Sequence, residues 1–226
     1  MRHRQSAVPG HEYKHHDEPL PVCEKGRSAD RAVSIGWLNA QSLRNKTDAV
    51  SELNGDRSLD VLALTETWHT DSDDVCLRLA TPPGYAVADV ARSPCRAGGG
   101  VAVIYRQHLK CCRVTLPACG TFEAICVRLT SARNQVVLLN IYRPGSEKTS
   151  VQFFDELSAV LETLVIYACP VVIGGYFNVR YQLANDPDSR CLSGVLSSFD
   201  MVQHVGGATH RCSNTLDLVM TFADCQ

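Results

Sequence analysis

Short apolar runs, each bounded by polar or turn-forming residues, follow one another from about residue 33 to the end of the chain. Runs of this length that are rich in Val, Ile, Leu and Tyr are typical of buried β-strands. The pattern predicts strands at Val33–Leu38, Val61–Leu64, Tyr85–Val90, Val101–Tyr105, Val114–Leu116, Phe122–Leu129, Val136–Tyr142, the run that ends at Gly174, and Leu216–Met220. Several of these strands leave no room for a helix between them, which argues against regular strand–helix–strand units.

Helical spacing of apolar residues is clearest over Thr149–Ile166, where one face carries a continuous stripe. The stripe consists of Phe153, Leu157, Val160, Leu161 and Leu164. Thr149 and Gln152 match a capping box at the start of this helix. Shorter helices are predicted at Thr47–Leu53 and Leu192–Phe199. Dense strands with a few helices predict an α/β (α+β) fold in four layers, in which two packed β-sheets are flanked by helices.

Residues 1–31 are polar, and their apolar residues follow neither the helical nor the strand spacing. This predicts a disordered leader in front of a domain that spans residues 32–226. The four histidines of this leader are interpreted as solvated. Gly98, Gly99 and Gly100 precede a predicted strand and indicate a backbone bend or bulge. No Lys-Ser/Thr pair or helix follows them, so a phosphate-binding P-loop is not predicted.

Composition and charge are those of an ordinary globular protein with a small net charge. The chain has 226 residues, 45% apolar and 20% charged, and a formal net charge of -2, so the overall charge does not favour nucleic acid. Basic residues are concentrated between Arg92 and Arg133, and acidic residues between Asp48 and Asp89. The basic stretch could follow phosphates, or its side chains could simply solvate strand faces.

The eleven cysteines do not indicate a disulfide framework or a zinc site. No Cys-x-x-Cys pair occurs, Cys111 and Cys112 are adjacent, and the number is odd. Cys126 and Cys169 lie in apolar runs and are predicted to be small core residues. No signal-peptide-like stretch and no apolar run of about 18 residues is present. These features predict a reducing, intracellular compartment and no membrane partner.

Polar side chains recur where the apolar runs end. They are Asn39, Glu66, Asn140, Tyr142, Asn178 and Asp217. Strands that end together place such residues around one opening, where carboxylate and amide oxygens suit a hard cation such as Mg²⁺. As isolated residues they also have ordinary interpretations: Glu66 as a cap or surface acid, Asn39 and Asn178 as turn formers, Tyr142 as an edge aromatic, and Asp217 as a partner of buried backbone groups.

Six segments in order along the chain resemble one protein family. They are Leu38–Leu43, Leu64–Trp68, Gly98–Val103, Asn140–Pro144, Gly175–Asn178, and Thr209–His210 together with Thr215–Val219. The set is similar to the endonuclease/exonuclease/phosphatase superfamily with its DNase I-like fold. In particular it resembles the apurinic-type endonuclease domain of LINE-type non-LTR retrotransposon polyproteins. The similarity runs from about residue 33 to residue 221.

The resemblance implies metal-assisted hydrolysis of a DNA phosphodiester with Mg²⁺ or Mn²⁺. The product would be a nicked strand with a 3′-hydroxyl that primes reverse transcription. Glu66 would be the principal metal ligand, with Asn39 beside it. DNA would be the substrate, a reverse transcriptase downstream in the parent polyprotein would be a partner, and a functional protein would act in the nucleus.

By the same resemblance, four further positions act on the phosphate. Tyr142 would contact the scissile phosphate, and Asn178 would orient it or the attacking water. Thr209 would also touch the phosphate. Asp217 would support the site on the leaving-group side. His204 and His210 are interpreted as structural or surface residues.

Two departures from the family pattern predict weak or absent activity. Tyr176 occupies the position where the family has an aspartate in Gly-Asp-Phe-Asn, and a phenol of pKa about 10 is a poor base at neutral pH. The family also closes with a Ser-Asp-His segment, and the chain stops at Gln226 without it. We therefore expect a C-terminally truncated domain with an exposed sheet edge or core face.

Two other functions stay open. The first is a non-catalytic nucleic-acid-binding or interaction module that keeps the fold, which the Tyr176 substitution favours. The second is a phosphatase of the same superfamily that acts on phosphoinositides or sphingolipids. Thr215–Val219 and Asn140–Pro144 are more similar to the retrotransposon branch, so the phosphatase ranks behind the endonuclease.

Overall fold

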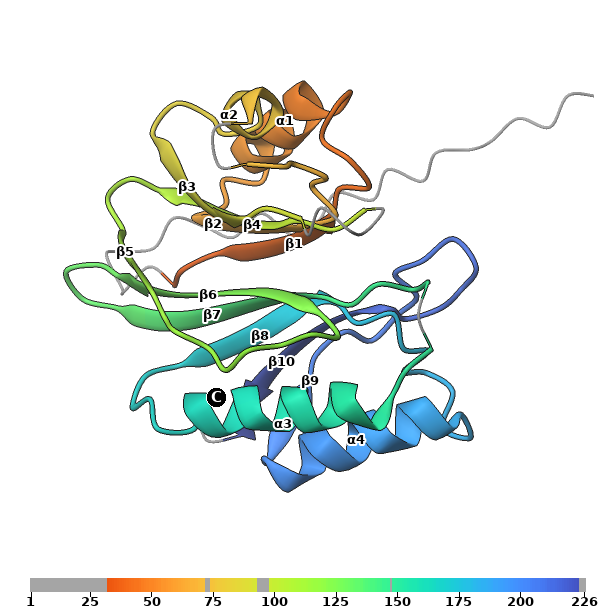
Figure 1. Ribbon diagram of the computed structural model, residues 1–226. Coiled ribbons are helices and arrows are strands. Elements are labelled where there is room, and N and C mark those ends of the chain that lie inside the picture. The colour runs from red at the N-terminus through yellow and green to blue at the C-terminus, as the bar shows by residue number, and fades with distance from the viewer. Residues whose placement is uncertain (1–31, 72–73, 93–97, 147, 224–226) are drawn as a thin grey trace, which may run out of the picture. The chain divides into compact units, whose positions relative to one another are not determined.

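The computed structural model describes residues 32–71, 74–92, 98–146 and 148–223. The predicted disordered leader and its histidines lie outside the described residues. Within these described residues, ten strands form two mixed sheets (Figure 1). The four-stranded sheet has the order β1 (Ile35–Asn39), β2 (Val61–Thr65), β4 (Val101–Arg106), β3 (Tyr85–Val90). The six-stranded sheet has the order β5 (Lys110–Arg113), β6 (Glu123–Thr130), β7 (Gln135–Tyr142), β8 (Val171–Tyr176), β10 (Asp217–Phe222), β9 (Met201–Gln203).

The two sheets face each other and helices cover both outer faces (Figure 1). The helices are α1 (Thr47–Asp56) and α2 (Val75–Leu79) over the four-stranded sheet, and α3 (Val151–Leu164) and α4 (Pro187–Ser198) over the six-stranded sheet. Three apolar clusters fill the three interfaces between these layers. The predicted four-layer α/β sandwich is therefore confirmed.

Helix α3 begins later than its predicted capping box. The N-cap is Ser150, whose hydroxyl accepts a hydrogen bond from the backbone N–H of Phe153 at 3.3 Å. The pairing of Thr149 with Gln152 is thus wrong, and Gln152 instead donates to Glu156 one turn further along, at 2.7 Å. The predicted apolar stripe is buried, because it faces the six-stranded sheet.

Short elements account for the other differences. The strand predicted at Val114–Leu116 is wrong: the fifth strand is β5, and only Val114 extends its ladder, donating to the Cys126 carbonyl at 2.9 Å. Helix α4 begins five residues before Leu192, because Asp186 caps it and Pro187 occupies its first turn. The five-residue helix α2 and the three-residue strand β9 are too short to show a period and had not been predicted.

A buried amide joins the two sheets. Asn140 on β7 donates from Nδ2 to the Leu64 carbonyl at 2.8 Å and to the Ala102 carbonyl at 3.4 Å, both in the opposite sheet. The residue is fully buried. Asn140 therefore lies inside the sandwich, two residues before β7 ends, and the expectation that it lines the opening with the other polar residues is wrong.

We expect Asn140→Ala to lower the free energy of unfolding by about 1–3 kcal/mol, because two buried carbonyls would each lose the hydrogen bond that Asn140 donates. Urea unfolding of the chain and the variant measures this difference. Gln135→Ala, at the exposed start of the same strand, is the matched control and should change stability by less than about 0.5 kcal/mol. Equal effects of the two substitutions would show that the amide does not hold the sheets together.

Candidate active site

The first half of the candidate site lies at one end of the four-stranded sheet. Strands β1 and β2 are parallel, and Asn39 is in register with Thr65, so Asn39 and Glu66 emerge at the same edge. Asn39 donates from Nδ2 to Glu66 Oε1 at 2.8 Å, while its Oδ1 accepts from the backbone N–H of Gln41 at 3.1 Å. In this arrangement Asn39 orients the Glu66 carboxylate.

The second half comes from three neighbouring strands of the six-stranded sheet. Tyr142 ends β7, Tyr176 ends β8, and Asp217 begins β10. Tyr176 is in register with Tyr142 on one side and with Asp217 on the other. The two tyrosine rings are stacked, with centroids 6.2 Å apart and an interplanar angle of 19°. Because adjacent strand ends present these residues, they lie at one edge of the sheet.

Electrostatics link the two halves. Burial raises the pKa of the Tyr176 phenol, and the charges of Glu66 and Asp217 raise it further, with Arg143 opposing. Burial also raises the pKa of Asp217; a hydrogen bond with Thr209 opposes this shift, Glu66 adds to it, and His210 lowers it. Glu66 belongs to one sheet and Asp217 to the other. The effect of Glu66 on the pKa of Asp217 indicates that the two carboxylates lie near the same opening.

A pocket of about 350 Å³ lies at this opening. It is lined by Trp37, Leu38, Asn39, Gln41, Tyr176, Thr209, His210 and Asp217. The Thr209 hydroxyl accepts hydrogen bonds from the backbone N–H groups of Leu216 and Asp217, both at 3.0 Å, which fixes the start of β10. His210 had been interpreted as structural or surface; in the structure it lines this pocket and acts electrostatically on Asp217.

Asn178 and Tyr142 are held in a different way. The Asn178 backbone has a φ of 53°, and its side chain fills the space above Gly145, where an added Cβ would lie 2.0 Å from Nδ2. Among the described residues, no hydrogen bond joins its side chain to Glu66 or Asp217. Tyr142 is only 6% exposed, and its ring belongs to the core between the sheets. The roles that the resemblance implies for these two residues stay predictions.

Arg143 is a positioning residue that sequence reasoning had missed. It is 5% exposed, and its guanidinium donates to the carbonyls of Phe177 at 2.7 Å and Asn178 at 2.6 Å. These bonds fix the turn that follows Tyr176. The only hint in the sequence is its place in Tyr142-Arg143-Pro144, directly after a buried strand.

The donor set fits a hard divalent cation. The Glu66 carboxylate contributes to the raised pKa of Asp217, and a cation beside Asp217 would favour its ionised form. Mg²⁺ typically takes one or two carboxylates and completes its shell with water and substrate phosphate. No cluster of three or more His, Cys, Asp or Glu side chains suited to a metal occurs within the described ranges, so a closed zinc-type site is not formed there.

We expect Asp217→Asn to raise the Tm of the metal-free protein at neutral pH. The pKa of Asp217 is raised in the folded state, so the protonated carboxyl is favoured and stability is lost as the pH rises through that pKa. The asparagine stays neutral and avoids this loss. Thermal unfolding in EDTA across the pH range should show the advantage vanishing below the ordinary aspartate pKa of about 3.9. An asparagine variant that is less stable at neutral pH would contradict the raised pKa.

A profile of a known protein family matches most of the chain. The sequence profile described as "Endonuclease/Exonuclease/phosphatase family" matches residues 36–221. No curated protein sequence matches the chain. None of the helices in the described residues has the length and apolar character needed to cross a membrane.

Solved structures with a similar fold share little sequence with this chain. The endonuclease domain of TRAS1, a telomere-specific non-LTR retrotransposon, is 13% identical, with a TM-score of 0.66 over 83% of each chain. The AP endonuclease LMAP from Leishmania major is 15% identical, with a TM-score of 0.66 over 90% of this chain and 84% of the other. The 3′ phosphatase NExo from Neisseria, bound to a product DNA hairpin, is 18% identical, with a TM-score of 0.57 over 85% and 88%.

Proposed function

Because the chain belongs to the endonuclease/exonuclease/phosphatase family, we propose that it is a Mg²⁺- or Mn²⁺-dependent DNA endonuclease domain of the non-LTR retrotransposon type, with low activity. The observation that carries the proposal is that Asn39, which binds the Glu66 carboxylate, and Asp217 come from two different sheets and line one pocket together with Thr209. Such an arrangement suits a phosphodiester, because it combines a place for a cation with polar groups for the phosphate.

The residues have distinct roles in this proposal. Glu66 would hold the cation, and Asn39 keeps its carboxylate in place. When bound, the cation neutralises negative charge that develops on the phosphate. Asp217 would serve the leaving-group side, while Tyr142, Asn178 and Thr209 would contact the phosphate. Tyr176 has a raised pKa and stays neutral at pH 7, so it can donate a hydrogen bond but cannot accept the proton of the attacking water.

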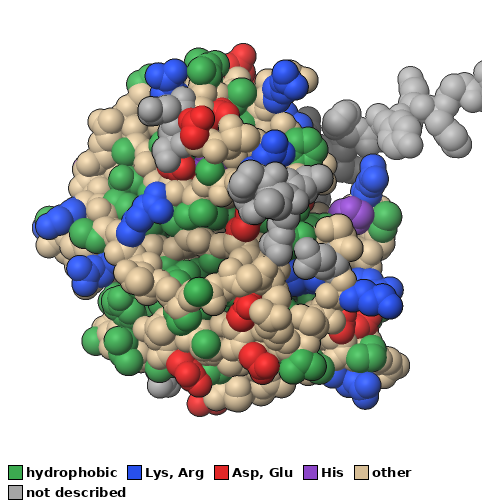
Figure 2. Space-filling model, viewed as in Figure 1, with side chains coloured by type: hydrophobic (Ala, Val, Ile, Leu, Met, Phe, Trp, Pro, Cys, Tyr) green, Lys and Arg blue, Asp and Glu red, His purple; other side chains and the backbone are tan. Residues whose placement is uncertain are grey.

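DNA as the substrate is supported by the neighbours rather than by net charge. An AP endonuclease and a phosphatase bound to product DNA share the fold. Acidic and basic side chains are interspersed on the face seen in Figure 2, so no field of one sign dominates that face. The retrotransposon neighbour supports the non-LTR assignment, in which a reverse transcriptase of the parent polyprotein would extend the nicked strand inside the nucleus.

A plasmid assay tests the proposal. We expect the chain to nick supercoiled plasmid slowly in Mg²⁺ or Mn²⁺ and not in EDTA, and to leave ends that a DNA polymerase can extend without further treatment. Nicking that is unaffected by EDTA would contradict metal dependence. Ends that a polymerase cannot extend would contradict cleavage that leaves a 3′-hydroxyl.

A non-catalytic nucleic-acid-binding module is the second candidate, because Tyr176 removes the expected base from the site. DNA binding that survives Glu66→Ala, without metal-dependent cleavage by the unmodified chain, would favour it. Release of inorganic phosphate from a phosphoinositide or sphingolipid head group would instead favour the phosphatase.

A further inference from the structure

A second cavity, of about 410 Å³, lies next to the candidate active site. Its walls come from four segments. They are the loop after β1 with Ser42 and Arg44, the turn after β2 with Thr67 and Trp68, the start of α2 with Asp74 and Cys76, and the residues after β3, which include Arg92. Backbone bonds tie the first two segments together, from Ser42 N–H to the Glu66 carbonyl at 2.7 Å and from Leu43 N–H to the Thr67 carbonyl at 3.2 Å. The cavity is therefore built on fixed backbone that continues the β1–β2 pairing.

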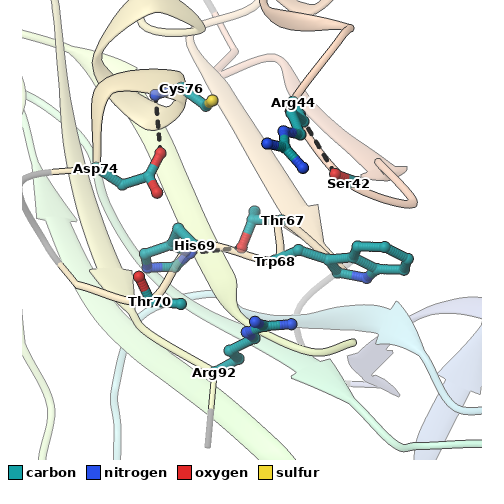
Figure 3. A pocket seen from close by; sticks show the side chains of 9 residues that line it. All are labelled: Ser42, Arg44, Thr67, Trp68, His69, Thr70, Asp74, Cys76 and Arg92. Atoms are coloured by element: carbon teal, nitrogen blue, oxygen red, sulfur yellow. Dashed lines mark hydrogen bonds between the residues drawn. The ribbon is translucent and has the colours of Figure 1, made fainter. Parts of the chain in front are cut away.

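The charges in this cavity favour an anion. Arg44 and Arg92 extend into it from the top and the bottom of the view in Figure 3, with the Trp68 indole beside them. Within the part of the chain that the structure describes, neither guanidinium is paired with an acidic side chain. The one lining carboxylate, Asp74, caps α2 and accepts from the backbone N–H groups of Cys76 at 2.8 Å and Leu77 at 3.3 Å. Two converging arginines form a preferred phosphate site in proteins.

The aromatic wall is exposed and held in place. Trp68 is 44% exposed and has a φ of 60°, a conformation that is costly for a bulky residue. Its N–H donates to the Gly99 carbonyl at 2.9 Å, and Thr67 N–H donates to the Gly100 carbonyl at 3.2 Å. Beneath it, a buried chain of hydrogen bonds runs from the Thr67 hydroxyl to His69 at 2.6 Å.

That chain continues from His69 to the Asp89 carboxylate at 3.1 Å, so the turn is anchored to β3. The turn is thus fixed both by the glycine backbone and by buried side chains. Strained backbone that the surroundings hold so firmly is typical of functional sites. Here its effect is to present an indole to solvent at the rim of a cationic cavity.

The indole also lies near the Tyr142 hydroxyl. Its nitrogen lies 3.3 Å from the point where a Cβ on Gly98 would stand, and the Tyr142 hydroxyl lies 3.5 Å from the same point. Trp68 is two residues after Glu66 in the chain. A ligand on the indole would consequently be next to a phosphate held at Glu66 and Tyr142, as adjacent units of one nucleic-acid strand are.

We propose that this cavity is a nucleotide subsite, in which an unpaired base stacks on Trp68 while Arg44 and Arg92 hold its phosphate. The proposal rests on the proposed action on DNA and narrows the substrate to DNA with an unpaired nucleotide beside the cut bond. The cavity volume lies within the range of pockets that enclose small ligands, about 300–1,000 Å³. A base inside a continuous duplex cannot stack on an indole without leaving its neighbours, so paired DNA would not use the subsite.

Binding measurements in EDTA, where no strand is cut, test the subsite directly. The probes are a short fluorescein-labelled duplex, the same duplex with one unpaired nucleotide, and a third in which that nucleotide lacks its base. Fluorescence anisotropy should show that the unmodified chain binds the unpaired-nucleotide probe most tightly. Trp68→Ala should weaken binding of this probe about tenfold or more, leave the duplex unchanged, and abolish the difference between probes with and without the base.

Conservative and charge variants separate stacking from folding. Trp68→Phe keeps an aromatic face and should retain most of the preference for the unpaired base. Arg44→Gln combined with Arg92→Gln should reduce the slope of log affinity against log salt by about 1 for the unpaired-nucleotide probe. Arg190→Gln, on the exposed surface of α4 beyond the six-stranded sheet, is the matched control and should leave the slope unchanged.

The possible outcomes distinguish this inference from the proposed function. Equal losses for paired and unpaired probes in Trp68→Ala, or no loss in either, would overturn the nucleotide subsite while leaving DNA cleavage intact. A chain that binds none of the probes and nicks no plasmid would overturn the proposed function itself. Loss of the preference in Trp68→Ala, together with its retention in Trp68→Phe, supports the subsite.

Discussion

Replacing Tyr176 by aspartate should raise the rate of plasmid nicking by on the order of 10²–10⁴-fold, the usual contribution of one acid–base group. Tyr176 lies at the end of β8 between Tyr142 and Asp217, and the charges of Glu66 and Asp217 contribute to its raised pKa. A carboxylate at this position is ionised at neutral pH and can orient and deprotonate a water. The neutral phenol can form a hydrogen bond with a water but cannot take its proton.

The same substitution should make stability depend on the cation. A third carboxylate beside Glu66 and Asp217 is unfavourable without a counter-charge, and the stacking of Tyr176 on Tyr142 is lost. We expect Tyr176→Asp to have a lower Tm than the parent in EDTA and to recover more of it than the parent on addition of Mg²⁺. Tyr176→Phe, which keeps the ring, is the control and should gain neither activity nor metal dependence. An aspartate variant no faster than the phenylalanine variant would show that this position does not limit the rate.

Glu66→Gln should abolish metal-stimulated nicking, with a loss on the order of 10²-fold or more in the Tyr176→Asp background, where the rate is easiest to measure. The amide keeps the shape of the side chain and can still interact with Asn39, but it lacks the charge that would hold the cation. Initial nicking rates at several Mg²⁺ concentrations measure the effect. Glu52→Gln, on the exposed surface of α1, is the control for the loss of one negative charge. Metal-stimulated nicking that persists in Glu66→Gln would remove Glu66 from the site.

Long, periodic elements could be predicted from the sequence, because burial in a sheet or on a helix face imposes a repeating apolar pattern. Tyr85–Val90 was predicted with both its boundaries, and the apolar stripe of α3 is buried against its sheet. The apolar pattern does not show where a helix begins when a capping side chain determines its first residue. Ser150 and Asp186 start α3 and α4 through single hydrogen bonds, and a capping residue one position away has a similar sequence.

The candidate site was predictable in part, for a related reason. Parallel pairing of β1 with β2 brings Asn39 and Glu66 to one edge, as their places at the ends of apolar runs indicate. The sequence does not show whether a polar residue near the end of a strand faces the opening or the space between the sheets. Asn140 was therefore expected at the opening, although its amide joins the two sheets. Arg143 was missed because its function is to hold the carbonyls of a turn 34 and 35 residues away, a contact that only the folded chain creates.

The cavity at Trp68 depends even more on tertiary structure. Its two arginines come from segments after β1 and after β3, which the order β1-β2-β4-β3 brings around the turn that follows β2. In the sequence, Arg44 lies far from Arg92, which opens the basic stretch. That stretch itself does not form one surface: Arg106 is paired with Asp60 at 3.0 Å, and Arg113 donates to the Asp89 carbonyl.

Crystals of the protein grown with Mn²⁺, measured at an X-ray wavelength where manganese scatters anomalously, would locate the cation. We expect an anomalous peak at the opening between the two sheets, about 2.1 Å from a carboxylate oxygen of Glu66, with Asp217 bound directly or through water. A peak elsewhere on the protein, with none beside Glu66, would contradict this expectation.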